Sequence, residues 1–405
     1  MSTWLARNFV KDMNEYYDVV IIGGAAMGSS AAFFLMENSD FDGSVLIVER
    51  DPTFERSSTA LSLSSVRHQF TNPLNVRISQ FGTEFIREFR ERTSIEGHGI
   101  DLSFQENGYL FLWSEEYVEN AKAQVAVQNS LGADIVLLSP QNTKEFFPHL
   151  RVDDIAAASF GRSGEGWFDN VGLMDGMRRK ACSLGAEFVA DEVVGLELLC
   201  GRVANVYAAS GRSIGCGAVI NASGPRCAHI AGMLGIALPV VPQKRSVFVI
   251  DCQRSPVGRL PLMIDTTGVF CRPEGSYFIC GSEPLVAGDT DVDDFEVVHE
   301  EFEEIIWPAL AARSENFESV KVVNFWAGHY AFNLFDQNAI VGAHPEIKNF
   351  FFVNGFSGHG IQQSPAMGRA ISELVAYGEY RSLDLSAMGF DRVLSGIRFS
   401  EGAII

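Results

Sequence analysis

The chain has 405 residues, of which 47% are hydrophobic and 20% charged, a globular composition with length for two domains and a large buried ligand. The formal charge of −20 argues against nucleic acid and anionic membranes as partners. Seven cysteines, an odd number without a CxxC pair, predict reduced structural thiols and no metal site. Since residues 1–16 lack a signal-peptide pattern and no apolar run approaches the roughly 20 residues of a membrane span, we expect a cytoplasmic protein without a membrane span.

The first predicted elements form a βαβ unit. The apolar run 18–22 predicts a buried strand, the glycine-rich turn and small residues after it predict a helix, and a second strand at 45–48 ends in Glu49. This order is the dinucleotide-binding fingerprint. Gly23 would permit the tight turn and Gly28 the close packing of helix on strand, while the helix N-terminus would face a pyrophosphate. Glu49 would accept hydrogen bonds from an unphosphorylated adenosine ribose.

One residue departs from the fingerprint, because Ala25 stands where a glycine normally lets the backbone approach the pyrophosphate. A chance strand–turn–helix is the alternative, but the second strand and its terminal acid favour an ADP-containing cofactor. The Ser/Thr-rich loop 51–70 should run along that cofactor. The cofactor residues predicted so far are Gly23, Gly24, Ala25, Ala26, Met27, Gly28, Glu49, Arg50, Ser58, Thr59 and Ser64.

Helical and strand patterns then alternate along the chain. Helices are predicted at 74–92, 115–131, 172–184, 297–311 and 365–377. Strands are predicted at 108–113, 186–189, 193–199, 202–209, 218–222, 240–250, 320–325 and 350–354, with a hairpin at 269–281 and an acidic loop at 289–294. Ligands bind at the carboxyl ends of such strands and at the helix N-termini that follow. These places add Ala222, Ser223, Gly224, Gly355, Gly358, His359, Gly360, Ile361 and Gln362 to the predicted cofactor residues. Val193, at the start of the strand 193–199, is also predicted to contact the cofactor.

Four segments together resemble the FAD-dependent D-amino-acid oxidase superfamily, which includes glycine oxidase, monomeric sarcosine oxidase and D-arginine dehydrogenase. They are the fingerprint at 19–50, the turn 221–225, the hairpin 272–275 and the glycine-rich turn 355–360. The segments 58–70, 335–338 and 358–363 are most similar to a mitochondrial branch of this superfamily that is associated with respiratory complex I assembly.

The resemblance implies an α/β fold, α+β overall, in which a Rossmann-like FAD-binding domain carries an inserted mixed-sheet substrate domain. The FAD-binding domain would be discontinuous and comprise 1–95, 151–235 and 336–405. The substrate domain would comprise 96–150 and 236–335.

The resemblance also implies a reaction: oxidation of the C–N bond of an amino acid or N-alkyl amino acid, with hydride passing to flavin N5 and the imine hydrolysing. FAD would be non-covalent, because Gly328 stands where sarcosine oxidase has its tethering cysteine. The oxygen-activating lysine of that enzyme falls on Ile279, so oxygen should be a poor acceptor, and a quinone or a protein remains open. The alternative is a flavin-binding assembly factor with little or no catalysis. A nicotinamide enzyme is disfavoured, because there is no second complete fingerprint.

The resemblance names the catalytic candidates. Arg67 matches the arginine that binds the substrate carboxylate in sarcosine oxidases, and Tyr330 matches an active-site tyrosine. Lys244 and Arg245 match a basic pair of D-arginine dehydrogenase, although a solvated strand end is the simpler interpretation. Arg67 has an alternative role in a salt bridge of the flavin loop.

Because this chain differs from its relatives at several site residues, its substrate cannot be inferred from theirs. Gln362 replaces a lysine that helps to clamp the carboxylate in sarcosine oxidase. His68, with His329 and His359, is a candidate base, but histidines of this kind are more often packed or hydrogen-bonded. His68 is also the residue that could tether the flavin.

Overall fold

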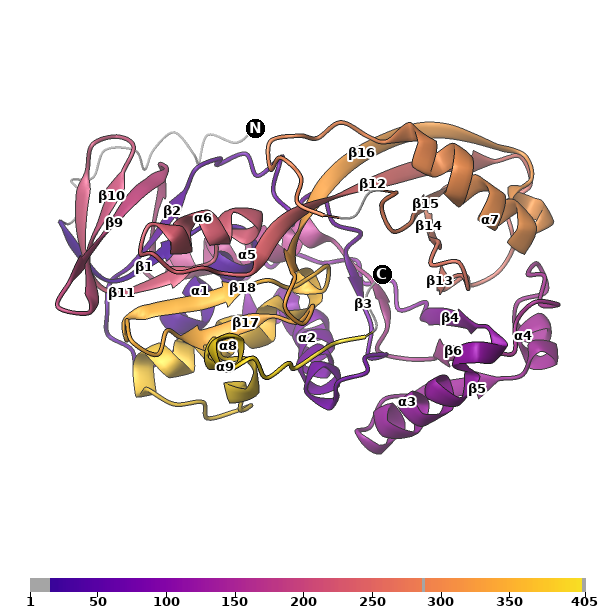
Figure 1. Ribbon diagram of the computed structural model, residues 1–405, viewed down its shortest axis with the longest axis horizontal. Helices are drawn as coiled ribbons and strands as arrows, with labels where there is room; N and C mark the ends of the chain where they lie inside the picture. Colours follow the sequence, from indigo (N-terminus) through magenta and orange to yellow (C-terminus); the bar gives the residue numbers. More distant parts are fainter. Residues whose placement is uncertain (1–14, 286–287, 403–405) are drawn as a thin grey trace.

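The computed structural model describes residues 15–285 and 288–402. Two eight-stranded sheets form the two halves of the molecule (Figure 1). In a separate two-stranded sheet, β3 (Ser65–Val66) pairs with β7 (Gly166–Trp167). This confirms the mixed α/β fold class. The division of the chain into a cofactor domain and a substrate domain remains a prediction.

The first sheet has the strand order β17-β18-β11-β1-β2-β8, with the hairpin β9–β10 attached to β11. Its central strands are parallel, and β17 is antiparallel. The bounds are β1 (Tyr16–Ile22), β2 (Val45–Glu49), β8 (Glu187–Ala190), β9 (Val193–Leu199), β10 (Arg202–Ala208), β11 (Ser213–Asn221), β17 (Ile340–Ala343) and β18 (Phe350–Asn354). β2 and β18 are buried along their whole length, in keeping with their apolar sequences, which end in Glu49 and Asn354.

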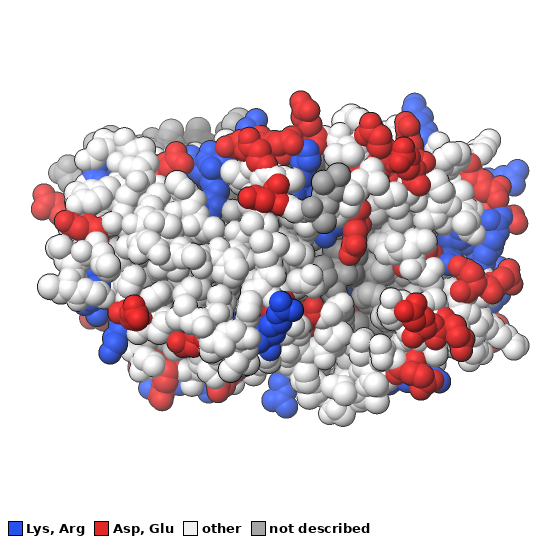
Figure 2. All heavy atoms as spheres, viewed as in Figure 1, with Lys and Arg blue, Asp and Glu red and all other residues white. Residues whose placement is uncertain are grey.

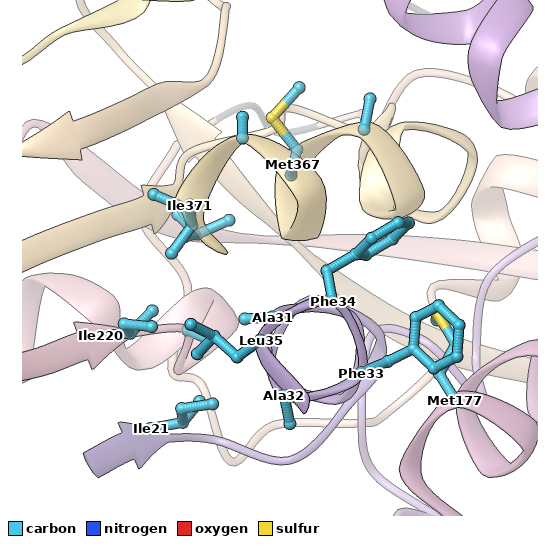
Figure 3. Packing of buried hydrophobic residues seen from close by; sticks show 14 of the residues in the cluster. Ile21, Ala31, Ala32, Phe33, Phe34, Leu35, Met177, Ile220, Met367 and Ile371 are labelled. Carbon is cyan, nitrogen blue, oxygen red and sulfur yellow. The ribbon is translucent and has the colours of Figure 1, made fainter. Parts of the chain in front are cut away.

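Helices cover this sheet: α1 (Ala26–Glu37), α2 (Pro73–Arg92), α5 (Asn170–Ser183), α6 (Cys227–Gly232), α8 (Gly360–Tyr377) and α9 (Asp391–Ser395). Figure 3 shows α1 end-on, with side chains directed at α8, at α5 and at the strands. Small residues let α1 and α8 touch, because a Cβ on Gly368 would lie 2.1 Å from Ser30 Oγ. The hydroxyl of Ser30 donates to the carbonyl of Ser364 at 2.7 Å, which fixes this crossing.

The second sheet has the order β16-β12-β15-β14-β13-β4-β6-β5. Its strands are β4 (Tyr109–Trp113), β5 (Ile135–Leu138), β6 (Ala157–Gly161), β12 (Val240–Cys252), β13 (Leu262–Ile264), β14 (Phe270–Glu274), β15 (Tyr277–Gly281) and β16 (Val320–Asn333). The accompanying helices are α3 (Val118–Ser130), α4 (Pro140–Phe146) and α7 (Trp307–Arg313). β6 belongs to this sheet although it lies in the segment 151–235, so the chain returns to the first sheet only after residue 161.

Two predicted helices differ from the observed ones. α8 begins at Gly360 rather than Pro365. Pro365 has no N–H to donate to the carbonyl of Ile361, and the hydroxyl of Ser364 donates to that carbonyl instead, at 2.9 Å, so the helix tolerates the proline. The helix predicted at 297–311 is a π-helical turn at 301–306 followed by α7, in which Pro308 likewise has no N–H.

The described residues contain no helix long and apolar enough to cross a membrane. They also contain no group of three or more His, Cys, Asp or Glu side chains that could hold a metal ion. All seven cysteines are free thiols. On the face seen in Figure 2, acidic side chains gather along the upper and right-hand parts, with basic ones between them, in keeping with the charge of −20.

Candidate active site

A cavity of about 270 Å³ lies where β1, β2 and β11 end. Gly23, at the end of β1, has φ +97°, and a Cβ on it would lie 2.5 Å from the carbonyl oxygen of Ala222. Only glycine allows these two strand ends to approach so closely. The predicted cofactor residues that line this cavity are Gly23, Ala25, Ala26, Met27, Glu49, Arg50, Ser58, Thr59, Val193, Ala222, Ser223, Gly224, Gly358, Gly360 and Ile361.

Glu49 closes β2 at the rim of this cavity. Its carboxylate accepts hydrogen bonds from the backbone N–H groups of Gly24 (2.7 Å) and Asp51 (2.9 Å). Burial raises the pKa of Glu49, and these two bonds act in the opposite direction. A carboxylate held in this way is an oriented acceptor, which is what a ribose diol requires.

The loop 51–70 reaches the N-terminus of α1. Thr59 Oγ1 accepts from the N–H of Ala26 at 3.1 Å, and the hydroxyl of Ser58 donates to the carbonyl of His329 at 2.6 Å. The loop therefore connects the fingerprint helix with a strand of the second sheet.

Six predicted cofactor residues lie elsewhere. Gly24, Gly28 and Gly355 line neither this cavity nor its neighbour, and they have packing roles because a Cβ on each would meet surrounding atoms within 3.0 Å. Ser64, His359 and Gln362 line the neighbouring cavity instead.

The acidic loop predicted at 289–294 and the residue after it were not predicted to contribute, yet Val292, Asp293 and Phe295 line the first cavity. Asp293 forms an ion pair with Arg226 at 2.5 Å, and the guanidinium of Arg56 lies 5.3 Å from the ring centroid of Phe295. The only sequence signal for these contacts was that Arg226 directly follows the turn 221–225. Asp51, Phe54, Arg56, Ser57, Ser62, Asp191, Glu192, Pro225, Arg226, His229, Ile230 and His329 were also missed as lining residues.

A second cavity, of about 70 Å³, adjoins the first. The two share Ser58, Ser62, His329, Tyr330, Gly358 and Ile361 as lining residues. Arg67, Tyr109 and Arg245 line only the second cavity. No aspartate or glutamate is present among the described residues that line it.

Arg245 is the distinctive group of the second cavity. Its side chain is buried, and Nε and Nη1 have no hydrogen-bond partner among the described residues. Its guanidinium lies 5.0 Å from the ring centroid of Tyr330, which supports it by a cation–π contact. The ring of Tyr330 is packed in turn on Gly358, where a Cβ would lie 2.6 Å from the ring.

Arg67 also lines the second cavity but is engaged by its own loop. Its Nη1 donates to the carbonyl of Gln69, and its guanidinium lies 4.2 Å from the ring centroid of Phe70. Gln362 Oε1 accepts from the N–H of Arg67 and from the hydroxyl of Ser79, both at 2.9 Å. Gln362 therefore holds the backbone that carries Arg67.

Two catalytic candidates lie outside both cavities. Lys244 points to the other side of β12 from Arg245 and forms an ion pair with Asp294 at 2.5 Å. His68 has Nε2 3.0 Å from Thr83 Oγ1, and burial lowers its pKa to about 4. A neutral, packed ring in this place agrees with the alternative in which His68 is a packed, hydrogen-bonded residue and not a base.

Glu165 is a buried acid behind the second cavity that the sequence did not single out. It accepts from the N–H groups of His68 (2.6 Å) and Gln69 (3.1 Å) and from the side-chain amide of Gln69 (2.9 Å). Burial raises its pKa to about 7. Glu165 thus fixes the backbone that follows Arg67.

The first cavity fits a dinucleotide in its chemistry, with a buried ribose acceptor at one strand end and the N-terminus of α1 beside it. The second cavity offers a cationic site directly next to it. Together they define a protein with a site suited to a dinucleotide and a cationic cavity beside it.

Comparison with known proteins specifies the class. The profile of the family described as FAD dependent oxidoreductase (DAO) matches residues 18–374. FAD-dependent oxidoreductase domain-containing protein 1 of Xenopus laevis is 39% identical over 415 residues, which cover 94% of this chain and 83% of the relative. Glycine oxidase of Geobacillus kaustophilus is 25% identical and covers 94% of this chain and 98% of its own. Among solved structures, L-proline dehydrogenase from P. horikoshii superposes with a TM-score of 0.84 at 26% identity, over 95% of this chain and 99% of that one.

The chain belongs to the FAD dependent oxidoreductase (DAO) family. FAD, bound non-covalently, is its cofactor, as the resemblance implies. The residues that would hold it are those that line the first cavity.

Proposed function

We propose that the protein oxidises the C–N bond of an amino acid or an N-alkyl amino acid, giving an imine that hydrolyses. The observation that carries this proposal is the buried guanidinium of Arg245, with two nitrogens unpartnered among the described residues, in the cavity next to the cofactor site. The names of two similar proteins, glycine oxidase and L-proline dehydrogenase, are compatible with such a substrate.

A buried cation without a partner is costly, and an anionic ligand removes that cost. A carboxylate is the natural match, because a guanidinium can donate two parallel hydrogen bonds to it and fix both its position and its angle. The cation–π contact with Tyr330 would hold Arg245 in place for this interaction. Arg67, which is engaged by Gln69, would add positive potential rather than the main contact.

The second requirement of the reaction is a neutral substrate amine. Two guanidinium groups line the second cavity and no carboxylate does among the described residues, so the environment disfavours an ammonium and lowers the pKa of a bound amine. When FAD is bound, its flavin accepts the hydride from the substrate carbon. The buried side chains that line the cavity support this step because they limit the water that reaches the reacting atoms.

The test is an anaerobic screen of L-, D- and N-methyl amino acids against the holoprotein, with loss of flavin absorbance as the signal. For the best substrate, Arg245→Ala should lower the rate constant ratio kcat/KM by roughly two orders of magnitude, since charged hydrogen bonds worth about 3 kcal/mol are lost. Arg245→Lys keeps the charge but loses the fork and should recover only part of the rate. Lys244→Ala, which breaks the ion pair with Asp294 outside the cavity, should have a much smaller effect.

Two results would contradict the proposal. If Arg67→Ala lowers the rate and Arg245→Ala does not, the role assigned to Arg245 is wrong and the carboxylate binds at Arg67, as the resemblance implies. If no compound bleaches the flavin, the protein is better described by the alternative of a flavin-binding assembly factor. The cytoplasmic location and the identity of the electron acceptor stay predictions.

A further inference from the structure

The face of the second sheet that borders the second cavity carries a cationic side chain next to a group of apolar ones. Side chains of a strand alternate between its two faces, so Arg245 and Val247 of β12 point the same way. Both line the second cavity. Phe248, the residue after Val247, points to the opposite face and packs in a core cluster with Leu310 of α7.

The same alternation continues across the neighbouring strands. Leu262 and Ile264 of β13 line the cavity, while Met263 between them belongs to the core cluster of the opposite face. Phe270 of β14 pairs with Ile264 and also lines the cavity. We call Val247, Leu262, Ile264 and Phe270 the apolar wall; each is 1–7% exposed.

A glycine makes room for this wall. Gly281 pairs with both Val247 and Phe270, and a Cβ on it would lie 2.4 Å from Phe270 Cζ. The ring of Phe270 therefore occupies the space that a side chain at position 281 would need. The hydroxyl of Tyr109, beside the wall, is paired with the hydroxyl of Ser65 at 2.8 Å.

We propose, on the basis of the function proposed above, that the substrate has an uncharged, apolar side chain that packs on the apolar wall. Arg245 and Val247 are two residues apart on one strand, about 7 Å along it. A carboxylate on Arg245 thus directs the rest of the substrate to Val247, Ile264 and Phe270. A cationic side chain would be buried there without a carboxylate, because none lines the cavity among the described residues. An acidic side chain would depend on Arg67, which Gln69 and Phe70 already engage.

The experiment compares side chains of similar length on the holoprotein. Norleucine, lysine and glutamate, each as the L- and D-isomer, are mixed anaerobically with the protein, and the rate of flavin reduction is measured. Norleucine should reduce the flavin roughly 100-fold or more faster than lysine or glutamate at equal subsaturating concentration, since each charged side chain would be desolvated without compensation. In parallel, hexanoate and 6-aminohexanoate are titrated and the perturbation of the flavin spectrum is followed, which measures binding without turnover.

A pair of variants tests the position of the wall. Ile264→Asp should shift the preference from norleucine towards lysine, because it supplies the missing carboxylate. The asparagine of Ile264→Asn has nearly the same shape as the aspartate but no charge. This variant should slow the reduction of the flavin by norleucine without speeding its reduction by lysine. Bound FAD and the parent's absorption spectrum establish that each variant is folded. If Ile264→Asp does not fold, the comparison of norleucine with lysine on the parent protein still tests whether the substrate side chain is apolar.

The outcomes separate this inference from the proposed function. Reduction by amino acids with no preference for norleucine, or with a preference for lysine or glutamate, would overturn the apolar side chain and leave C–N oxidation intact. Absence of reduction by every amino acid, together with tighter binding of hexanoate than of 6-aminohexanoate, would overturn C–N oxidation while the apolar wall stands. If both carboxylates bind equally and none of the amino acids reacts, both proposals fail.

Discussion

The contact between Gly28 and Gly23 gives the most direct test of how the fingerprint builds the cofactor site. Gly28 lies in the first turns of α1, and a Cβ on it would lie 1.8 Å from the carbonyl oxygen of Gly23. Gly23 has little freedom to move, because its N–H donates to the carbonyl of Val48 at 2.9 Å and its Cα faces Ala222. In Gly28→Ala, α1 and the end of β1 must therefore move apart by about 1 Å or more.

Overpacking of this kind costs about 1–3 kcal/mol, and a clash with backbone belongs at the upper end of that range. The N-terminus of α1 lines the first cavity, so the displacement should reach the cofactor. A loss of about 3 kcal/mol weakens FAD binding by roughly 100-fold, because every 1.4 kcal/mol is a factor of ten. The assay is titration of the apoprotein with FAD, followed by flavin fluorescence, alongside urea unfolding of the apoprotein.

Gly232→Ala is the matched control. Gly232 ends α6, and no atom lies within 4 Å of a Cβ placed on it. Because alanine is the better helix former, this variant should bind FAD like the parent and be equally or slightly more stable. The reasoning about Gly28 is refuted if Gly28→Ala has the parent's affinity for FAD and the parent's urea midpoint.

Three other outcomes are expected. Glu49→Ala should reduce FAD affinity by about tenfold or more in the same titration, since a charged acceptor at the ribose position is lost; unchanged affinity would mean that the ribose binds elsewhere. Glu165 has a pKa of about 7 in the folded protein, above its unfolded value, so its contribution to stability is complete below about pH 4.5 and is lost as the pH rises through 7. The free energy of unfolding of Glu165→Gln, measured with urea, should therefore rise by about 3 kcal/mol relative to that of the parent between pH 5 and 8. If the free energies of the two proteins follow parallel curves with pH, Glu165 does not cause the pH dependence of the parent. Stopped-flow reoxidation of the reduced protein in air should be slow, because Ile279 brings no charge where a relative has its oxygen-activating lysine; a rate typical of oxidases would show that another cation acts there.

The first cavity could be predicted because its determinants are local in sequence. The turn at Gly23, the N-terminus of α1 and the acid at Glu49 all lie within one βαβ unit, whose geometry follows from strand, helix and strand packing. The turn 355–360 at the start of α8 could be predicted for the same reason. The acidic loop 289–294 and Phe295 could not, because they reach the cavity only through the arrangement of the two halves.

The second cavity depends on strand register, which the sequence leaves open. Of the neighbours Lys244 and Arg245, alternation requires that they face opposite sides, but a shift of one residue would exchange them. The pairing of β12 with β16 decides this, and it contains an irregularity between Val249 and Ile250. β13 was not predicted at all, since three residues are too short a run to recognise, and it supplies half of the apolar wall.

The contacts over the first cavity have a consequence for the protein as a whole. Arg226 follows β11 of the first sheet, whereas Asp293 belongs to the loop between β15 and α7 of the second half, and their ion pair spans the two. His329 of β16 approaches the same loop, with Nε2 3.1 Å from the carbonyl oxygen of Asp291. The first cavity is therefore lined by both halves of the molecule, although the fingerprint motif lies in one of them. Since a ligand that binds only the folded arrangement stabilises it by mass action, FAD bound in this cavity should hold the two halves together.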